Sequence, residues 1–247
     1  DFIQASPTPF HAVENLSKEL IKAGYNLLHE SDAWHIEPGQ GYFVCRNSSS
    51  LIAFRTGDGN LQDSGFKIVG AHSDSPCLKV KPQAALVNKG YAQCGVEVYG
   101  GVLLNPWFDR DLSLAGRVHY KHKSGDVAPC LIDFEKAIAS IPSLAIHLDR
   151  EANSKRSIDK QKHLAPVLLQ TSNNNDFDFN ALLLNFLHEN LGLIDAEKIL
   201  SYELSFYDNQ KATVIGMKEE FIASARLDNL LSCYLGLQSL IASNNDQ

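Results

Sequence analysis

Residues 66–76 read FKIVGAHSDSP, an apolar run that ends in a histidine, an aspartate and a proline. A mostly continuous apolar run bounded by turn signals is typical of a strand buried on both faces, as in a sheet covered by helices. We therefore predict a strand over 66–71 within an α/β fold whose mixed sheet is sandwiched between helices. Open α/β sheets bind ligands beyond the carboxyl ends of their strands, so 72–76 is the first candidate site.

A helix is predicted ahead of this run. Thr8 can cap it, Pro9 suits its first position and Gly24 suits its exit. Its expected buried stripe is formed by Val13, Leu16, Leu20 and Ala23.

Two short strands follow the helix at 42–45 and 50–55. Near the end of the chain, after Phe221, helical periodicity returns, with four residues expected on one face: Leu230, Tyr234, Leu237 and Ile241.

The middle of the chain has a different sequence pattern from its two ends. Short β-like stretches at 96–99, 117–123 and 130–134 are punctuated by Gly and Pro, and one helix is predicted at 180–191 ahead of Gly192. This part reads as a separate, mainly β unit. Its polar stretch at 171–178 is predicted to be a mobile surface loop.

Composition narrows the choice of partners and compartment. A formal net charge of -7 provides no basic field for nucleic acid or for an anionic membrane surface. No apolar run approaches the length of a membrane-spanning helix. The five cysteines form no C-x-x-C pair and are odd in number, so we expect reduced thiols in a cytoplasmic protein. The first residues contain no charged n-region and no apolar h-region, so we expect no secretory signal there.

His72 and Asp74 are the first candidate functional pair. Residues i and i+2 of an extended segment face the same side, so Asp74 can accept a hydrogen bond from one ring nitrogen of His72. That bond would fix the tautomer and leave the other nitrogen free for a metal. By itself, however, the pair is more typical of an ordinary strand-to-loop turn in which Asp74 bonds its own backbone before Pro76.

Asp228 and His147 are the other two candidates, and each has a simpler interpretation. The two oxygens of Asp228 can bridge two cations, yet Asp is also a preferred residue at a helix start. His147 interrupts an apolar run, where a lone histidine is usually structural and hydrogen-bonded.

These weak signals occur together in stretches that resemble the aspartyl aminopeptidases, a family of cytosolic metallopeptidases with two co-catalytic zinc ions. The matching stretches are SPTPFHAV (6–13), AHSDSPCLKVK (71–81), GVEVYGG (95–101), WFDRDL (107–112), the segment around His147, and ARLDNL (225–230). They span nearly the whole chain and are specific when taken jointly.

The resemblance implies roles for the four candidates. His72 would ligate one metal, Asp74 would orient His72, and Asp228 would bridge both metals. His147 would reach the active site of a neighbouring subunit. The implied reaction removes an N-terminal Asp or Glu from a peptide, with two zinc ions per complete site and cobalt or manganese as alternatives.

The resemblance also implies an organisation. A catalytic domain of residues 1–82 and 223–247 would be interrupted by a mainly β dimerisation domain over 83–222, and the protein would form a homo-oligomer, a dimer or a tetrahedral dodecamer. The family continues through a Glu-Glu pair, a further Asp and a final His, none of which can be assigned here. We therefore expect the C-terminal half of the catalytic domain to lie beyond Gln247.

A second hypothesis comes from another class of function. The chain would then be a catalytically silent assembly or peptide-binding module that keeps the fold.

Overall fold

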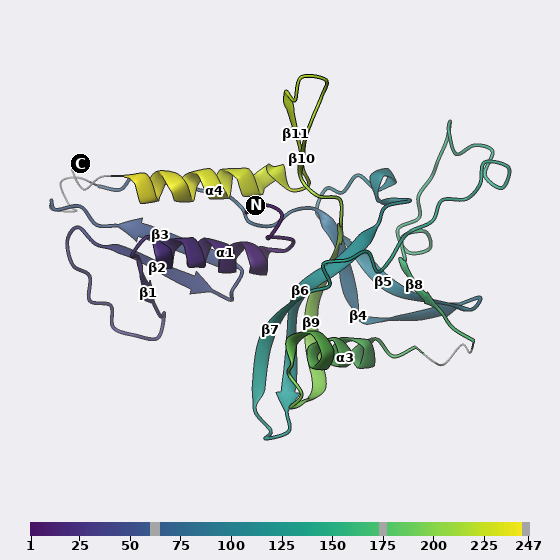
Figure 1. The fold of residues 1–247 in the computed structure, drawn as a ribbon, viewed down its shortest axis with the longest axis horizontal. Coiled ribbons are helices and arrows are strands. Elements are labelled where there is room, and N and C mark those ends of the chain that lie inside the picture. Colours follow the sequence, from purple (N-terminus) through teal and green to yellow (C-terminus); the bar gives the residue numbers. More distant parts are fainter. Residues whose placement is uncertain (60–64, 173–176, 244–247) are drawn as a thin grey trace. The chain divides into compact units, whose positions relative to one another are not determined.

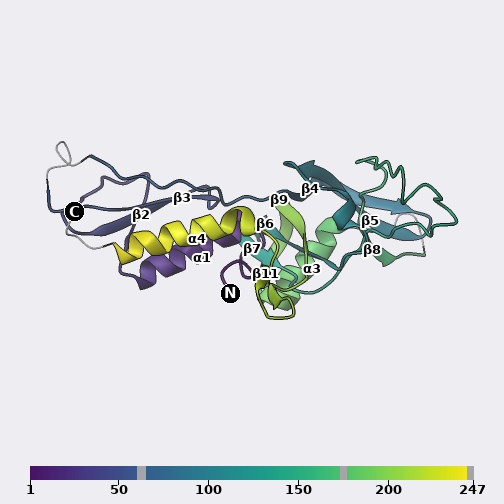
Figure 2. The ribbon, with the colours of Figure 1, turned by 90° about the horizontal axis from the view of Figure 1, so that it is seen from above.

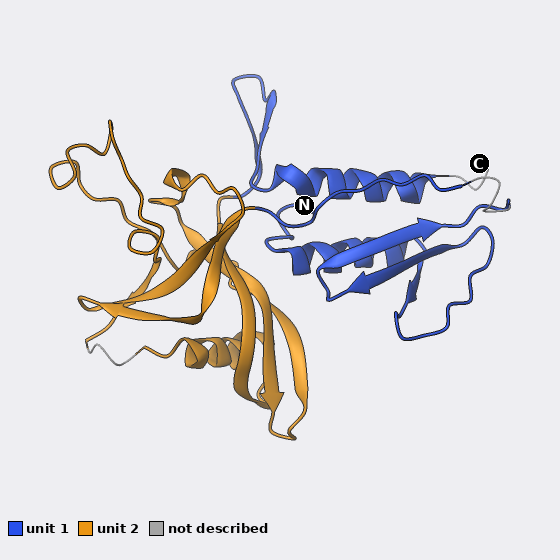
Figure 3. Ribbon diagram, turned by 180° about the vertical axis from the view of Figure 1, so that it is seen from behind, with its two compact units in different colours: residues 1–75, 211–247 blue, residues 76–210 orange. Residues whose placement is uncertain are grey.

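The computed structural model describes residues 1–59, 65–172 and 177–243. They form two compact units, Asp1–Ser75 with Lys211–Gln247, and Pro76–Gln210 (Figure 3). No helix in these described stretches is long and apolar enough to cross a membrane.

The first unit contains a small mixed sheet and a hairpin. Strands β1 (Asn26–Leu28), β2 (Gly41–Arg46) and β3 (Ser50–Arg55) lie in the order β1-β2-β3, and β10 (Thr213–Ile215) pairs with β11 (Phe221–Ala223). β1 runs parallel to β2, and β2 runs antiparallel to β3. The strands predicted at 42–45 and 50–55 are confirmed as β2 and β3.

Helix α1 (Pro9–Lys22) begins and ends close to where the sequence predicts. Proline occupies its first turn, and Gly24 follows its end with a φ of 84°. Thr8 is the N-cap residue but makes no side-chain capping bond, because its hydroxyl pairs with His11 Nδ1 at 2.8 Å. The predicted buried stripe was wrong at Ala23, which is exposed just beyond the last helical turn.

Helix α4 (Leu227–Ala242) packs against α1, and the two lie side by side in both views (Figures 1 and 2). The core beneath them is built from Leu16, Leu20, Tyr25, Phe43 and Leu237. Full burial of such an apolar side chain contributes about 1.5–3 kcal/mol. The helices and the sheet are therefore held together mainly by this shared core.

The strand predicted at 66–71 is absent. Residues 65–76 form no regular secondary structure, and the side chains of Phe66, Ile68 and Val69 are 79%, 87% and 78% exposed. Apolar composition predicts burial, but a strand also needs a neighbour for its backbone N–H and C=O groups. No described strand pairs with this segment.

The second unit is a six-stranded sheet in the order β7-β6-β9-β4-β5-β8, with every described pairing antiparallel. Its strands are β4 (Cys77–Asn88), β5 (Tyr91–Tyr99), β6 (Leu112–His122), β7 (Val127–Asp133), β8 (Val167–Gln170) and β9 (Ala196–Asp208). The predicted domain boundaries, 82/83 and 222/223, fall inside β4 and β11. The second unit contains the β-like stretches predicted at 96–99, 117–123 and 130–134.

Helix α3 (Phe179–Leu191) packs against β9 and buries Leu183 and Leu187 in the core of this unit. The Asp178 carboxylate caps its first turn, and Gly192 ends it in the left-handed conformation. This confirms the predicted helix. Half of the predicted surface loop at 171–178, residues 173–176, lies outside the described residues.

Gly116 provides a test of the packing between β6 and β9. A Cβ at this position would lie 2.1 Å from the backbone oxygen of Glu203, and the φ of 152° is unfavourable for other residues. We expect Gly116→Ala to destabilise the unit by about 2–5 kcal/mol. Thermal unfolding measures the change, with Gly101→Ala as the control, because a Cβ at Gly101 would meet nothing within 4 Å. Equal melting temperatures for the two variants would contradict this packing.

Candidate metal centre

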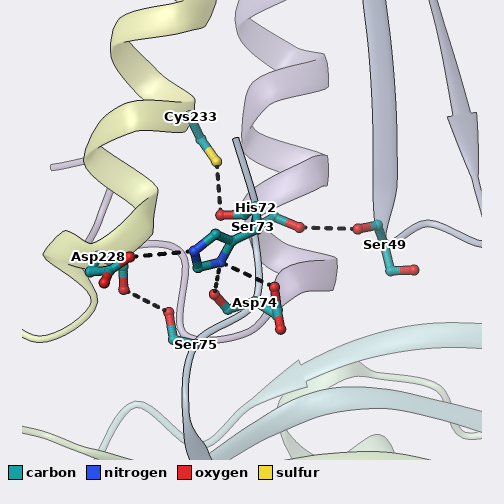
Figure 4. Close-up of polar contacts among 7 residues, drawn as sticks. All are labelled: Ser49, His72, Ser73, Asp74, Ser75, Asp228 and Cys233. Atoms are coloured by element: carbon teal, nitrogen blue, oxygen red, sulfur yellow. Dashed lines mark hydrogen bonds and ion pairs between the residues drawn. The ribbon is translucent and has the colours of Figure 1, made fainter. Parts of the chain in front are cut away.

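Three of the four candidate residues come together in the first unit. His72 and Asp74 lie on the irregular segment after β3, and Asp228 lies at the start of α4 (Figure 4). The tertiary fold thus brings a segment near the start of the chain next to one near its end.

Asp74 fixes the imidazole of His72. His72 Nδ1 lies 3.0 Å from the backbone oxygen of Asp74 and 3.2 Å from its carboxylate Oδ1 (Figure 4). Both atoms are acceptors, so Nδ1 carries the hydrogen. Nε2 is then the nitrogen that remains for a cation or a further proton.

Asp228 faces that nitrogen. Its Oδ1 lies 3.4 Å from His72 Nε2, and the two side chains are 92% and 56% exposed. Two ligand atoms on a tetrahedral zinc, each bonded at about 2.0–2.1 Å, are about 3.3–3.4 Å apart. The observed spacing therefore suits a shared zinc ion, and imidazole and carboxylate are donors that zinc accepts.

The start of α4 does not use Asp228 as a cap. Its N-cap position is Arg226, with no side-chain capping bond, and Asp228 itself has a non-helical backbone with φ -87° and ψ 108°. The peptide bond between Asp228 and Asn229 is cis. In place of a capping bond, the carboxylate is directed at His72 (Figure 4).

Two serines hold the backbone around the imidazole. Ser73 Oγ donates to the backbone oxygen of Ser49 at 3.1 Å, and Ser75 Oγ donates to that of Asp228 at 3.4 Å. Side-chain bonds thus hold the segment that follows the predicted strand. In the sequence, the signal for these side-chain bonds is the short polar run of Ser73, Asp74 and Ser75.

Cys233, on α4, makes a further side-chain hydrogen bond with the His72 segment, in addition to those of Ser73 and Ser75, and the sequence did not indicate it. Its thiol Sγ lies 3.2 Å from the backbone oxygen of His72, to which it donates (Figure 4). Burial raises the pKa of this thiol, and the Asp74 charge raises it further, while a backbone hydrogen bond lowers it. Cys233 is therefore a neutral donor, with no signature in the sequence beyond its spacing from Asp228.

The described part of the chain contains no group of three His, Cys, Asp or Glu side chains arranged to hold a metal ion. Asp74 and Asp228 lie at opposite nitrogens of the same ring, so only His72 and Asp228 converge. A catalytic zinc usually has three protein ligands.

His147 belongs to the second unit. It lies on a turn between β7 and β8 and is exposed, as are Ile146 and Leu148 beside it. The simpler interpretation was a structural, hydrogen-bonded histidine; in the structure the His147 side chain is exposed, and so are the apolar residues around it.

The family model and the curated proteins that match this chain describe aminopeptidases. Residues 2–247 match the family model described as aminopeptidase I zinc metalloprotease (M18). The chain is 54% identical over 250 residues to the probable M18 family aminopeptidase 2 of Ectopseudomonas mendocina, covering all of this chain and 57% of that protein. A Pseudomonas fluorescens relative of the same name is 54% identical with the same coverage.

Solved structures of other proteins also match this chain in fold. The cryo-EM structure of the Ape4 and Nbr1 complex matches with a TM-score of 0.89 and 39% identity, covering 98% of this chain and 49% of that one. The Chaetomium thermophilum mApe1 structure matches with a TM-score of 0.83 and 31% identity, covering 99% and 57%. The chain belongs to the M18 aminopeptidase family, and it spans 57% of the length of the curated relatives named above.

Asp74→Asn tests the orienting contact in the full-length protein. The variant loses the carboxylate charge but keeps the backbone oxygen that His72 Nδ1 also contacts. We therefore expect zinc affinity to fall by about 10-fold, the low end of the about 10- to 100-fold range for such partners. Competition with a chelator measures it, with the exposed Asp58→Asn as the matched control. Equal zinc affinity in both variants would show that Asp74 is only a turn residue.

Proposed function

We propose that the protein to which this chain belongs is a zinc aminopeptidase that releases N-terminal aspartate or glutamate from peptides. The observation that carries the proposal is the His72 ring, held at Nδ1 by Asp74 and facing the Asp228 carboxylate at 3.4 Å. Membership of a zinc metalloprotease family supports the same chemistry.

His72 and Asp228 would hold the metal, and zinc, when bound, supplies the Lewis acidity that peptide hydrolysis needs. The second carboxylate oxygen of Asp228 would serve a second ion, with cobalt or manganese as alternatives to zinc. Asp74 keeps the His72 hydrogen on Nδ1, so that Nε2 stays available as a ligand.

The preference for acidic N-terminal residues rests on the resemblance to aspartyl aminopeptidases. A cytoplasmic location is proposed as well, supported by five cysteines that form no disulfide within the described residues. The other hypothesis, a silent assembly or peptide-binding module, is not favoured by the family match.

The activity is tested with the zinc-loaded full-length protein and aminoacyl p-nitroanilides. We expect hydrolysis of Asp and Glu substrates to exceed that of Ala and Leu substrates. His72→Ala should reduce turnover by more than about 100-fold, since even residues that only hydrogen-bond a ligand contribute about 10- to 100-fold. Faster release of Leu than of Asp would overturn the acidic preference. Wild-type turnover by a folded His72→Ala protein would overturn the metal site.

The second unit is proposed to be an inserted dimerisation domain that carries His147 to the partner's active site. Exposed apolar side chains beside His147 support an interface there. The S. cerevisiae mApe1 structure, a dodecamer, matches this chain with a TM-score of 0.79 and 27% identity, covering all of it and 56% of that chain. In the partner's site, the imidazole would donate a hydrogen bond to the oxyanion that develops during hydrolysis.

Mixed oligomers test this shared site. Removal of one oxyanion donor costs about 100- to 1000-fold in turnover, so His147→Ala should lose that much while retaining zinc and assembly. Co-expression with Asp228→Ala should restore part of the activity, because a mixed dimer contains one complete site. Each variant expressed alone is the control. Full activity of zinc-loaded His147→Ala would contradict the shared site, and so would a mixture no more active than its parents.

A further inference from the structure

The loop that carries His147 is not held by burial of its own apolar side chains. Between β7 and β8 the chain forms a long arm of loops and turns (Figure 1). Within it, Leu144, Ile146 and Leu148 are 64%, 52% and 69% exposed. Short backbone bonds shape the turn, such as Leu148 N to Ala145 O at 2.8 Å. What keeps this turn in one place therefore lies at the two ends of the loop.

The first end is fixed to the core. Ile141 is buried, and its backbone oxygen accepts a hydrogen bond from Asp109 N at 2.9 Å. Two residues later, the backbone N–H of Ser143 donates to the Asp109 carboxylate at 2.8 Å. Hydrogen bonds from Ser143 lower the pKa of Asp109, with a smaller contribution from the Arg156 charge, so the carboxylate is an ionised acceptor at neutral pH. The chain thus enters the loop from a defined position.

Arg156 fastens the other end to the same place. Its guanidinium donates to Asn105 Oδ1 at 2.9 Å and to Ser143 Oγ at 3.3 Å, and lies 4.0 Å above the centroid of the Phe108 ring. A planar guanidinium can bond two acceptors and stack on a ring at once, which an ammonium group cannot do. One side chain therefore ties the exit of the loop to its entrance.

We propose that Arg156 is a positioning residue. It ties the two ends of the 143–156 loop together and thereby holds the turn that carries His147 in one position. The inference rests on the proposed role of His147 and goes beyond it by naming what holds that residue in place. Ile158, just beyond the loop, packs against the core of the second unit, and a loop tied at Arg156 as well has fewer conformations than one held only at its entrance and at Ile158. Misplacement of a catalytic group by about 1 Å costs about 100-fold, so the tie matters for turnover.

The test uses zinc-loaded full-length protein carrying Arg156→Ala, Arg156→Lys or Arg150→Ala. Arg150 is an exposed arginine of the same loop whose side chain makes no hydrogen bond or ion pair with another described residue, and it serves as the matched control. We expect turnover of Arg156→Ala to fall by about 10- to 100-fold with unchanged zinc content, and Arg156→Lys to recover little of it. Hydrogen exchange of peptides covering 143–156 should become faster only in the Arg156 variants.

Added guanidinium ion separates positioning from general stability. It should restore turnover to Arg156→Ala, where it can occupy the vacated place, and should not restore it to His147→Ala. If Arg156→Ala keeps wild-type turnover while His147→Ala is impaired, positioning by Arg156 is overturned and the shared site stands. If His147→Ala is itself fully active, the shared site and the positioning role of Arg156 are both overturned. Loss of turnover without faster exchange in the loop would also overturn the proposal.

Discussion

The site depends on one constraint, the orientation of a single imidazole. Asp74 contacts His72 Nδ1 through its backbone oxygen at 3.0 Å and through its carboxylate at 3.2 Å. The ring therefore has only Nε2 left to offer, and this nitrogen faces Asp228. The other local features serve this orientation: α4 starts with a non-helical Asp228, and side-chain bonds from Ser75 and Cys233 join α4 and the His72 segment. The result is a nitrogen and an oxygen at the separation that a tetrahedral metal requires.

Helix ends could be predicted from sequence, because they depend on residues close together along the chain. The pairing of His72 with Asp74 could be named as a candidate for the same reason, although the residues alone favoured an ordinary turn. Gly24 and Gly192 follow helices as expected. The resemblance brought Asp228 to the same site, whereas its residue type alone indicated a helix cap. The contact from Cys233 could not be predicted, since it depends on how α4 packs and a cysteine has no distinctive pattern there.

The failed strand over 66–71 has a different physical origin. Apolar composition records a tendency to be buried, whereas a strand is defined by hydrogen bonds to another segment. The described residues offer no such partner, and Phe66 and Ile68 stay exposed. His147 is a similar case: a lone histidine in an apolar run indicated a structural role, and the structure places it on an exposed turn. In both cases, local sequence could not supply the tertiary context.

The most direct test of the metal site is anomalous diffraction at the zinc edge from crystals of the zinc-loaded full-length protein. We expect a zinc peak bonded to both His72 Nε2 and an Asp228 carboxylate oxygen, at about 2.0–2.2 Å from each. His72 Nδ1 should still contact Asp74. Zinc bound elsewhere, with His72 Nε2 and Asp228 free of metal, would contradict the proposed metal site.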